Sequence, residues 1–205
     1  VASAIEEARE EPEHSAMLEL LDEAKLACTR GGQLADRLMS AARGNSDAER
    51  TRQCLAPLVS EILGLLRHSD RVRRCQVETV LDPSACVPVD GTLLSQIVSN
   101  LVLNAADATD GRGRIRVSVQ PCAEGGALAV ADDGPGIPED EQNTIFDPFH
   151  SSKSKGWGVG LLAVHLAVKA HGGTITVSRS DLGGALMTVI LPSEPASVRG
   201  APSLP

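Results

Sequence analysis

Residues 127–137 read ALAVADDGPGI, an apolar stretch that runs directly into an acidic turn punctuated by glycine. The apolar part predicts a buried strand that ends at Asp132. An ionised carboxylate only accepts hydrogen bonds, so Asp132 at a strand end suits the amino group of a flat ligand such as adenine. Gly134 and Gly136 let the backbone turn sharply beside such a ligand, and Ile137 offers it an apolar surface. Taken alone, the same residues also fit a plain Asp-Gly-Pro-Gly turn.

A predicted helix over 91–108 precedes this strand and carries polar side chains on one face. Gln96, Asn100, Asn104 and Asp107 follow one another at spacings of four, four and three residues. These spacings place the four side chains along one side of the helix. Amide oxygens are hard, neutral ligands that suit a magnesium ion shared with phosphate oxygens and water. Taken alone, however, an ordinary solvated helix face explains the spacing better.

A glycine-rich segment follows the strand and opens another predicted helix, over 161–170. Gly156, Gly158 and Gly160 alternate immediately before that helix. Alternating glycines expose backbone N–H groups, and a helix N-terminus adds positive potential for a phosphate. Lys153 would add charge to the same contact, and a flexible loop here would act as a lid over a nucleotide. Glycines also simply make loops, and neither a Walker A pattern nor a dinucleotide-binding fingerprint is present.

The flanking segments complete an alternation of helices and strands over residues 46–193, the expected catalytic domain. Beyond the helices above, the pattern predicts a helix over 48–67 and strands over 76–81, 114–119, 127–132, 174–178 and 186–191. This alternation favours the α+β class, with a two-layer α/β sandwich. Residues 194–205 are rich in Pro, Ser and Ala, so we expect a disordered tail or linker there.

Residues 1–45 are expected to form a helical hairpin, interrupted at Pro12. Apolar residues recur at three- and four-residue spacing from about 14 to 43. Such a hairpin cannot bury its apolar stripe alone, so pairing with a second copy in a four-helix bundle is the simplest arrangement. The alternative is that the helices pack on the following domain.

Composition narrows the class of protein further. The formal net charge is −8, so we expect no general attraction to nucleic acid or anionic lipid. The five cysteines are dispersed and lack CxxC spacing, which favours reduced thiols in a cytoplasmic protein over disulfides or zinc. No apolar stretch is long enough to span a bilayer, so we expect no direct membrane contact. The chain starts at Val1 and is expected to be a fragment, whose full-length protein could be membrane-tethered.

The order of these motifs resembles the GHKL, or Bergerat-fold, family that unites histidine kinases, DNA gyrase, a heat-shock chaperone and MutL. The matching residues are Asn100 and Asn104 for the asparagine box, Asp132, Gly134 and Gly136 for the first glycine box, Phe146 and Phe149 for the phenylalanine box, and Gly156, Gly158, Gly160 and Leu161 for the second glycine box. Four boxes in this order make the resemblance specific over roughly 55–192. IFDPF followed by Ser151-Ser152-Lys153 resembles the nitrogen-regulator-like subgroup of sensor histidine kinases.

The resemblance implies roles for these residues. By it, Asn104 coordinates Mg²⁺, Asp132 recognises the adenine of ATP, and about 149–160 form the ATP lid. The other residues expected to line the nucleotide site are Asn100, Asp107, Gly134, Gly136, Ile137, Lys153, Gly156, Gly158, Gly160 and Leu161. Hydrolysing members of the family place Glu four residues before the metal-binding Asn, where this chain has Asn100. A neutral amide cannot act as a general base, which favours phosphoryl transfer over hydrolysis.

The implied activity is that of an ATP-dependent protein-histidine kinase in a two-component system. The hairpin would dimerise with a second copy, and the phosphoryl group would pass from a histidine to the receiver domain of a response regulator. The alternatives are an ATPase of the same fold and a pseudokinase scaffold that needs no ATP. A nucleotide-binding test separates the scaffold from the kinase, and a turnover test separates the ATPase.

The chain departs from the family pattern at several positions. The family's acceptor histidine is followed by Glu or Asp, whereas His14 is followed by Ser15, so we expect the acceptor outside this chain. Ala185 stands where the family often has a Thr that helps to bind the base. Of the remaining histidines, His165 is expected on a helix surface and His171 at a helix end.

Overall fold

The computed structural model describes residues 51–147 and 160–194, and the structural statements below concern these residues. The expected helical hairpin over 1–45, most of the expected lid and nearly all of the expected tail lie outside the described residues. No described helix is both long and apolar enough to cross a membrane.

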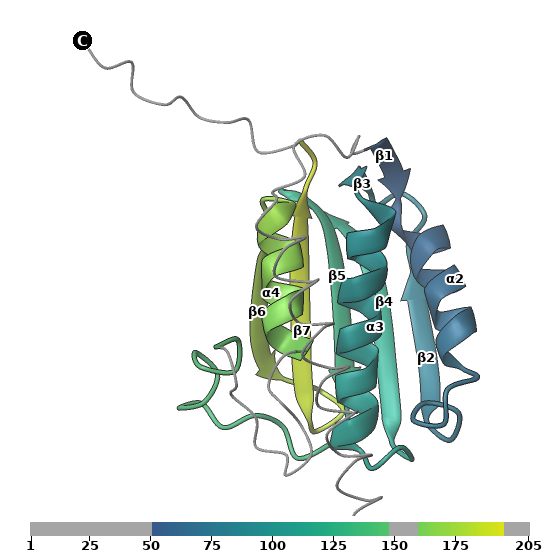
Figure 1. The fold of residues 1–205 in the computed structure, drawn as a ribbon, viewed down its shortest axis with the longest axis vertical. Coiled ribbons are helices and arrows are strands. Elements are labelled where there is room, and N and C mark those ends of the chain that lie inside the picture. The colour runs from purple at the N-terminus through teal and green to yellow at the C-terminus, as the bar shows by residue number, and fades with distance from the viewer. Residues whose placement is uncertain (1–50, 148–159, 195–205) are drawn as a thin grey trace, which may run out of the picture. The chain divides into compact units, whose positions relative to one another are not determined.

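The described elements form a helical layer on a mixed sheet. In chain order they are β1 (Thr51–Cys54), α2 (Leu55–Leu66), β2 (Gln76–Leu81), β3 (Cys86–Val89), α3 (Gly91–Ala108), β4 (Arg114–Cys122), β5 (Gly125–Asp132), α4 (Gly160–Ala170), β6 (Thr174–Arg179) and β7 (Ala185–Pro192). The five-stranded sheet has the order β2-β4-β5-β7-β6. Only β2 and β4 pair in parallel. The three helices lie on one face of this sheet (Figure 1), which confirms the expected two-layer α/β sandwich.

Side-chain alternation along the strands explains why one face is covered. Ile115, Val117 and Val119 of β4 are buried, whereas Arg116 and Ser118 between them line a hollow on the open side. The helices supply the matching apolar surface, as in α3, where Leu94, Ile97, Val98 and Leu101 are at most 2% exposed. Burial of each such side chain contributes roughly 1.5–3 kcal/mol. This shared core holds α3 and α4 on the sheet.

A buried histidine ties the start of α3 to the end of α4. The Asp90 carboxylate caps α3 by accepting hydrogen bonds from the backbone N–H groups of Thr92 (2.8 Å) and Leu93 (3.2 Å). His171, 1% exposed, follows α4 directly. Its Nε2 accepts from the Asp90 N–H (3.1 Å), and its Nδ1 lies 2.8 Å from the Ala167 carbonyl oxygen. These partners assign the proton to Nδ1.

The structure corrects two expectations at the start of the domain. Where a single helix was predicted over 48–67, the strand β1 precedes α2. This strand pairs with β3, which the sequence pattern did not predict. Both strands have only four residues, too few for a clear alternation, and each is formed through pairing with the other.

The pairing of β1 with β3 also overturns the expectation that the cysteines are all reduced. Cys54 and Cys86 lie directly opposite each other in this pair and form a disulfide. They are 32 residues apart in the sequence, so their spacing gave no indication of the contact. Cys75 and Cys122 are free.

Candidate nucleotide-binding site

Asp132 lies at the end of the central strand β5 and is 5% exposed. Its Oδ1 accepts hydrogen bonds from the backbone N–H groups of Gly134 (2.9 Å) and Ala185 (3.1 Å). The Asp132 carbonyl oxygen accepts from the Gly184 N–H at 3.0 Å. Backbone donors from two chain segments thus fix the orientation of this carboxylate.

Glycines make room for the carboxylate. A Cβ on Gly184 would lie 2.0 Å from Asp132 Oδ1 and 2.5 Å from the Gly134 nitrogen, and a Cβ on Gly134 would lie 2.9 Å from the Ala108 carbonyl oxygen. Gly136 has a φ of 79°, which favours glycine. The sequence indicated Gly134 and Gly136 but missed Gly184, whose only signal is its place in the glycine pair before the last strand.

The asparagines of α3 lie beside the first residue of α4. Asn100 and Asn104 are half-buried, and the Asn100 Nδ2 donates to the Gln96 carbonyl oxygen at 2.8 Å. A Cβ on Gly160 would lie 3.5 Å from Asn100 Oδ1 and 3.7 Å from both polar side-chain atoms of Asn104. The start of α4 and the asparagine face of α3 therefore lie side by side.

The C-terminal end of α3 connects this face to Asp132. The close approach of Gly134 to the Ala108 carbonyl places the turn after β5 against the last residue of α3. Asn104 lies one helical turn earlier on that helix. The structure thus arranges Asp132, Gly134, Asn104 and Gly160 around one end of α3.

Asp107, the fourth polar residue of the stripe, forms a two-pronged contact with Arg71. The Arg71 Nε donates to Asp107 Oδ1 at 2.8 Å, and its Nη2 donates to Asp107 Oδ2. The same Nη2 donates to the Leu103 carbonyl oxygen at 3.2 Å. Arg71 lies in the turn region between α2 and β2, 36 residues from Asp107. No local sequence motif contains Arg71, so nothing in the sequence indicated this contact.

Asp133, next to Asp132, is held differently. Its Oδ1 accepts from the Arg114 backbone N–H at 2.8 Å, and its Oδ2 accepts from the Arg114 Nε at 3.3 Å. The backbone hydrogen bond is the main cause that lowers the pKa of Asp133 below its ordinary value. Asp133 is therefore bound at the start of β4 while Asp132 is bound at the start of β7.

The apolar candidates pack on the domain core. Ile137, Phe146 and Leu161 are partly buried against it. The Phe146 ring lies 5.5 Å from the His165 ring, centroid to centroid. The expectation that His165 is a surface residue is wrong. It is half-buried, and its Nδ1 is enclosed without a hydrogen-bond partner among the described residues.

The remaining site candidates, Lys153, Gly156 and Gly158, lie outside the described residues, as does Phe149. Their expected contacts with phosphate stay predictions.

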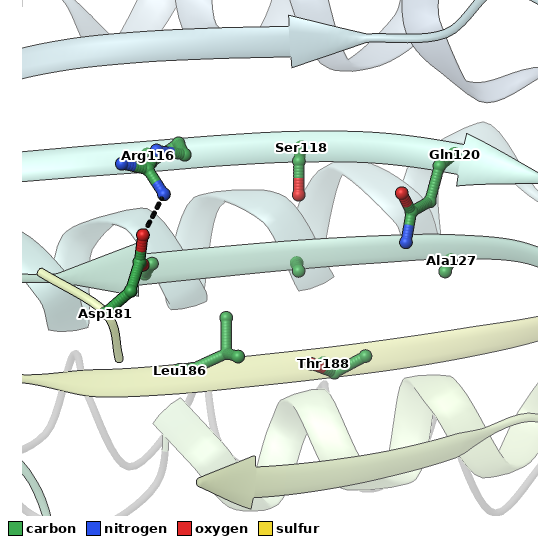
Figure 2. Close-up of a pocket in the computed structure, with 9 residues that line it drawn as sticks. Arg116, Ser118, Gln120, Ala127, Asp181, Leu186 and Thr188 are labelled. Carbon is green, nitrogen blue, oxygen red and sulfur yellow. Dashed lines mark hydrogen bonds and ion pairs between the residues drawn. The ribbon is translucent and has the colours of Figure 1, made fainter. Parts of the chain in front are cut away.

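The open face of the sheet carries a separate hollow of about 260 Å³. Figure 2 shows it lying across β4, β5 and β7, with the helices behind the strands. The lining residues are Arg116, Ser118, Gln120, Ala127, Ala129, Ala131, Asp181, Leu186 and Thr188. The Arg116 Nη1 donates to Asp181 Oδ2 at 2.7 Å. The asparagine face of α3 lies on the other side of the sheet, so this hollow is separate from the candidate nucleotide site.

Known proteins share this domain. The sensor histidine kinase ZraS of Escherichia coli O157:H7 is 35% identical over 139 residues, which are 67% of this chain and 30% of ZraS. The nitrogen regulation protein NtrY of Azorhizobium caulinodans is 28% identical over 173 residues, 80% of this chain and 22% of NtrY. This chain therefore spans less than a third of the length of these relatives.

Solved structures agree on the fold. The catalytic domain of histidine kinase ThkA matches with a TM-score of 0.65 and 28% identity, over 71% of this chain and 96% of that one. Full-length ShkA in complex with AMPPNP matches with a TM-score of 0.61 and 25% identity, over 83% of this chain and 38% of that one. Residues 89–195 match the family described as histidine kinase-, DNA gyrase B-, and HSP90-like ATPase. The chain belongs to this family, and its fold is that of the catalytic domain of sensor histidine kinases.

Proposed function

We propose that this chain binds Mg·ATP and supplies the catalytic half of a protein-histidine kinase. The observation that carries the proposal is the buried Asp132 carboxylate at the end of β5, which the backbone N–H groups of Gly134 and Ala185 orient. Gly134 lies against the last residue of α3, the helix that also carries Asn104. A buried acceptor of this kind suits the exocyclic amino group of adenine. AMPPNP, an analogue of ATP, is present in the related ShkA structure, which supports the same ligand here.

The asparagine face fits a magnesium-bound triphosphate. Asn100 donates its amide hydrogen to Gln96, an arrangement that turns its Oδ1 toward Gly160. Because Gly160 has no side chain, the amides of Asn100 and Asn104 are not covered by a methyl group there. Asn104 would hold the ion through its amide oxygen, together with phosphate oxygens and water. Mg²⁺, when bound, neutralises phosphate charge.

The same face favours transfer over hydrolysis. Asn100 occupies the position of the water-activating Glu of hydrolysing family members, and its amide cannot accept the proton of an attacking water. The proposed reaction moves the γ-phosphoryl group of ATP to a nitrogen of a histidine ring and leaves ADP. This chain would position ATP for that attack. Relatives named as sensor histidine kinases support this assignment.

The partners of this reaction are proposals of the same kind. A homodimer formed through the hairpin over 1–45 would bring an acceptor histidine to the ATP site. The receiver domain of a response regulator would then take the phosphoryl group. The kinship with two-component sensor kinases supports both partners in general terms.

Nucleotide binding is tested by calorimetric titration of the chain with Mg·ATP, Mg·ADP and Mg·GTP. Both adenine nucleotides are expected to bind. Mg·GTP is expected not to bind, because guanine carries an oxygen where adenine carries its amino group, and that oxygen would face the Asp132 carboxylate. A folded sample that binds no nucleotide would support the scaffold alternative.

The metal assignment is tested by repeating the ATP titration in EDTA. Wild-type affinity is expected to fall when magnesium is removed, whereas the affinity of Asn104→Ala is expected to be low and independent of magnesium. An equal magnesium dependence in both proteins would contradict the role of Asn104.

Phosphoryl transfer is tested by incubating the chain and γ-labelled Mg·ATP with a separately prepared dimerisation hairpin of a relative such as ZraS. Acid-labile, base-stable label on the hairpin is expected, as for phosphohistidine. Release of inorganic phosphate without labelling of the hairpin would instead indicate an ATPase.

A further inference from the structure

Asp107 puts a negative charge next to the residues proposed to hold the metal and the phosphates. It follows Asn104 by three residues on the same face of α3, so the two Cβ atoms are about 5–6 Å apart. An unpaired carboxylate at this distance would repel a polyphosphate. The inference below rests on the proposed function, because it concerns the phosphate end of that site.

Arg71 binds this carboxylate through two parallel hydrogen bonds and also binds the Leu103 carbonyl oxygen on the same helix face. A guanidinium that makes a two-pronged contact is held in one orientation against the carboxylate. Its positive charge is therefore fixed beside α3, at the edge of the asparagine face.

The Arg71–Asp107 ion pair is expected to contribute little to the stability of the fold. The side chains of Arg71 and Asp107 are 47% and 31% exposed, and solvent-exposed ion pairs contribute little to folding. The pair can still affect the binding of a polyanion. The Arg71 guanidinium cancels the charge of Asp107, the one carboxylate among the four polar residues Gln96, Asn100, Asn104 and Asp107.

We propose that Arg71 is a positioning residue of the nucleotide site, which neutralises Asp107 and thereby sets the affinity for the phosphates. Arg71 acts through Asp107 and through its own charge, and not as a ligand of the metal. Removing either partner changes the charge at the phosphate end by one unit, but with opposite sign.

The test is a double-mutant cycle on Mg·ATP affinity, measured by calorimetry. Arg71→Ala removes the positive charge beside Asp107 and is expected to weaken binding by about three- to tenfold at low salt. Asp107→Asn leaves the Arg71 charge unpaired and is expected to strengthen binding. The double variant Arg71→Ala/Asp107→Asn is expected to return to within about twofold of wild type, because it restores neutrality.

Further measurements separate the effect of charge from an effect on structure. Both single effects are expected to be smaller for Mg·ADP, which has one phosphate fewer, and to shrink in high salt because ions screen exposed charges. Arg71→Lys keeps the positive charge but cannot form the two parallel hydrogen bonds, so its Mg·ATP affinity is expected to lie between those of wild type and Arg71→Ala. Thermal unfolding of each variant checks that the domain is folded.

The chain offers a matched control on the opposite face of the sheet. Arg116 and Asp181 form a similar exposed ion pair there, so Arg116→Ala and Asp181→Asn are expected to leave nucleotide affinity unchanged. If both Arg71→Ala and Asp107→Asn weaken binding, the pair is structural or Asp107 is itself a ligand, and the inference is overturned. If Arg71→Ala binds like wild type, it is overturned as well. Absence of binding by the wild-type chain would instead overturn the proposed function.

Discussion

The two faces of the five-stranded sheet are built from the same strands but carry different kinds of side chain. On the helix-covered face, aliphatic side chains form the core, and the neighbouring end of β5 holds the buried carboxylate of Asp132 with backbone donors. On the open face, Arg116 pairs in solvent with Asp181 and Glu78 above small alanine side chains. Both faces contain an acidic residue near the start of β7, yet only Asp132 is buried.

This difference separates a candidate site from an ordinary surface. A buried carboxylate must have hydrogen-bond partners, and the backbone that supplies them also fixes its direction. The exposed carboxylate of Asp181 is bound mainly by the Arg116 side chain, and water screens this pair. A hollow in the surface, as on the open face, is therefore a weaker indication of function than an oriented buried charge.

The largest expected effect comes from Asp132→Asn. An amide cannot offer two acceptor oxygens, so the variant loses the charged acceptor for adenine, and Mg·ATP affinity is expected to fall roughly a hundredfold. Calorimetry measures the loss, and circular dichroism verifies the fold. On the open face, Asp181→Asn is the counterpart and is expected to bind like wild type. Unchanged affinity in Asp132→Asn would remove the distinction between the two carboxylates.

Gly184→Ala tests whether the crowding around Asp132 matters. The new methyl group would lie 2.0 Å from Asp132 Oδ1, so the carboxylate or the backbone must move, at a cost of about 1–3 kcal/mol in stability. Nucleotide affinity is expected to fall about tenfold, since the acceptor is displaced. Gly64→Ala is the control: nothing lies within 4 Å of its Cβ position, and it is expected to stabilise α2 by about 0.5–1 kcal/mol. Urea unfolding compares the two, and a stable, tightly binding Gly184→Ala variant would contradict the prediction.

His171→Leu tests the helical layer itself. The variant leaves the partly buried Asp90 N–H without its ring acceptor, which is expected to lower the free energy of unfolding by about 1–3 kcal/mol. Chemical denaturation measures the change. Arg116→Ala on the open face serves for comparison and is expected to have a smaller effect. A larger loss of stability in Arg116→Ala than in His171→Leu would contradict the expectation that the helix-covered face contributes more to stability than the open face.

The smallest expected effect is the acid sensitivity of the open-face pair. The hydrogen bond and charge of Arg116 lower the pKa of Asp181. A lowered folded-state pKa stabilises the protein above the ordinary carboxyl pKa of about 4 and loses that contribution as the pH falls through the folded value. Asp181→Asn is therefore expected to show a slightly flatter stability profile than wild type below about pH 4. Urea unfolding between pH 3 and 7 measures it, and identical profiles would show that the pair contributes nothing.

The sequence by itself determined the elements and motifs that depend on neighbouring residues. The bounds of β2 and α3 agree with the predicted ranges, and β4, β5, α4, β6 and β7 differ only by a few residues at their ends, whereas α2 starts seven residues later than predicted because β1 precedes it. Periodicity reports burial locally, so a long amphipathic helix such as α3 is readable without its partners. The strand that ends at Asp132 and the glycines after it are likewise local features, which is why the family could be identified before the fold was known.

Tertiary structure alone decided which distant residues meet. The pairing of β1 with β3, and with it the Cys54–Cys86 disulfide, depends on contacts across 32 residues. The closeness of Gly184 to Asp132 and the pair of Arg71 with Asp107 depend on how strands and turns are packed together. No periodic pattern encodes such contacts, because each is formed only when two separate segments are brought together by the shared hydrophobic core.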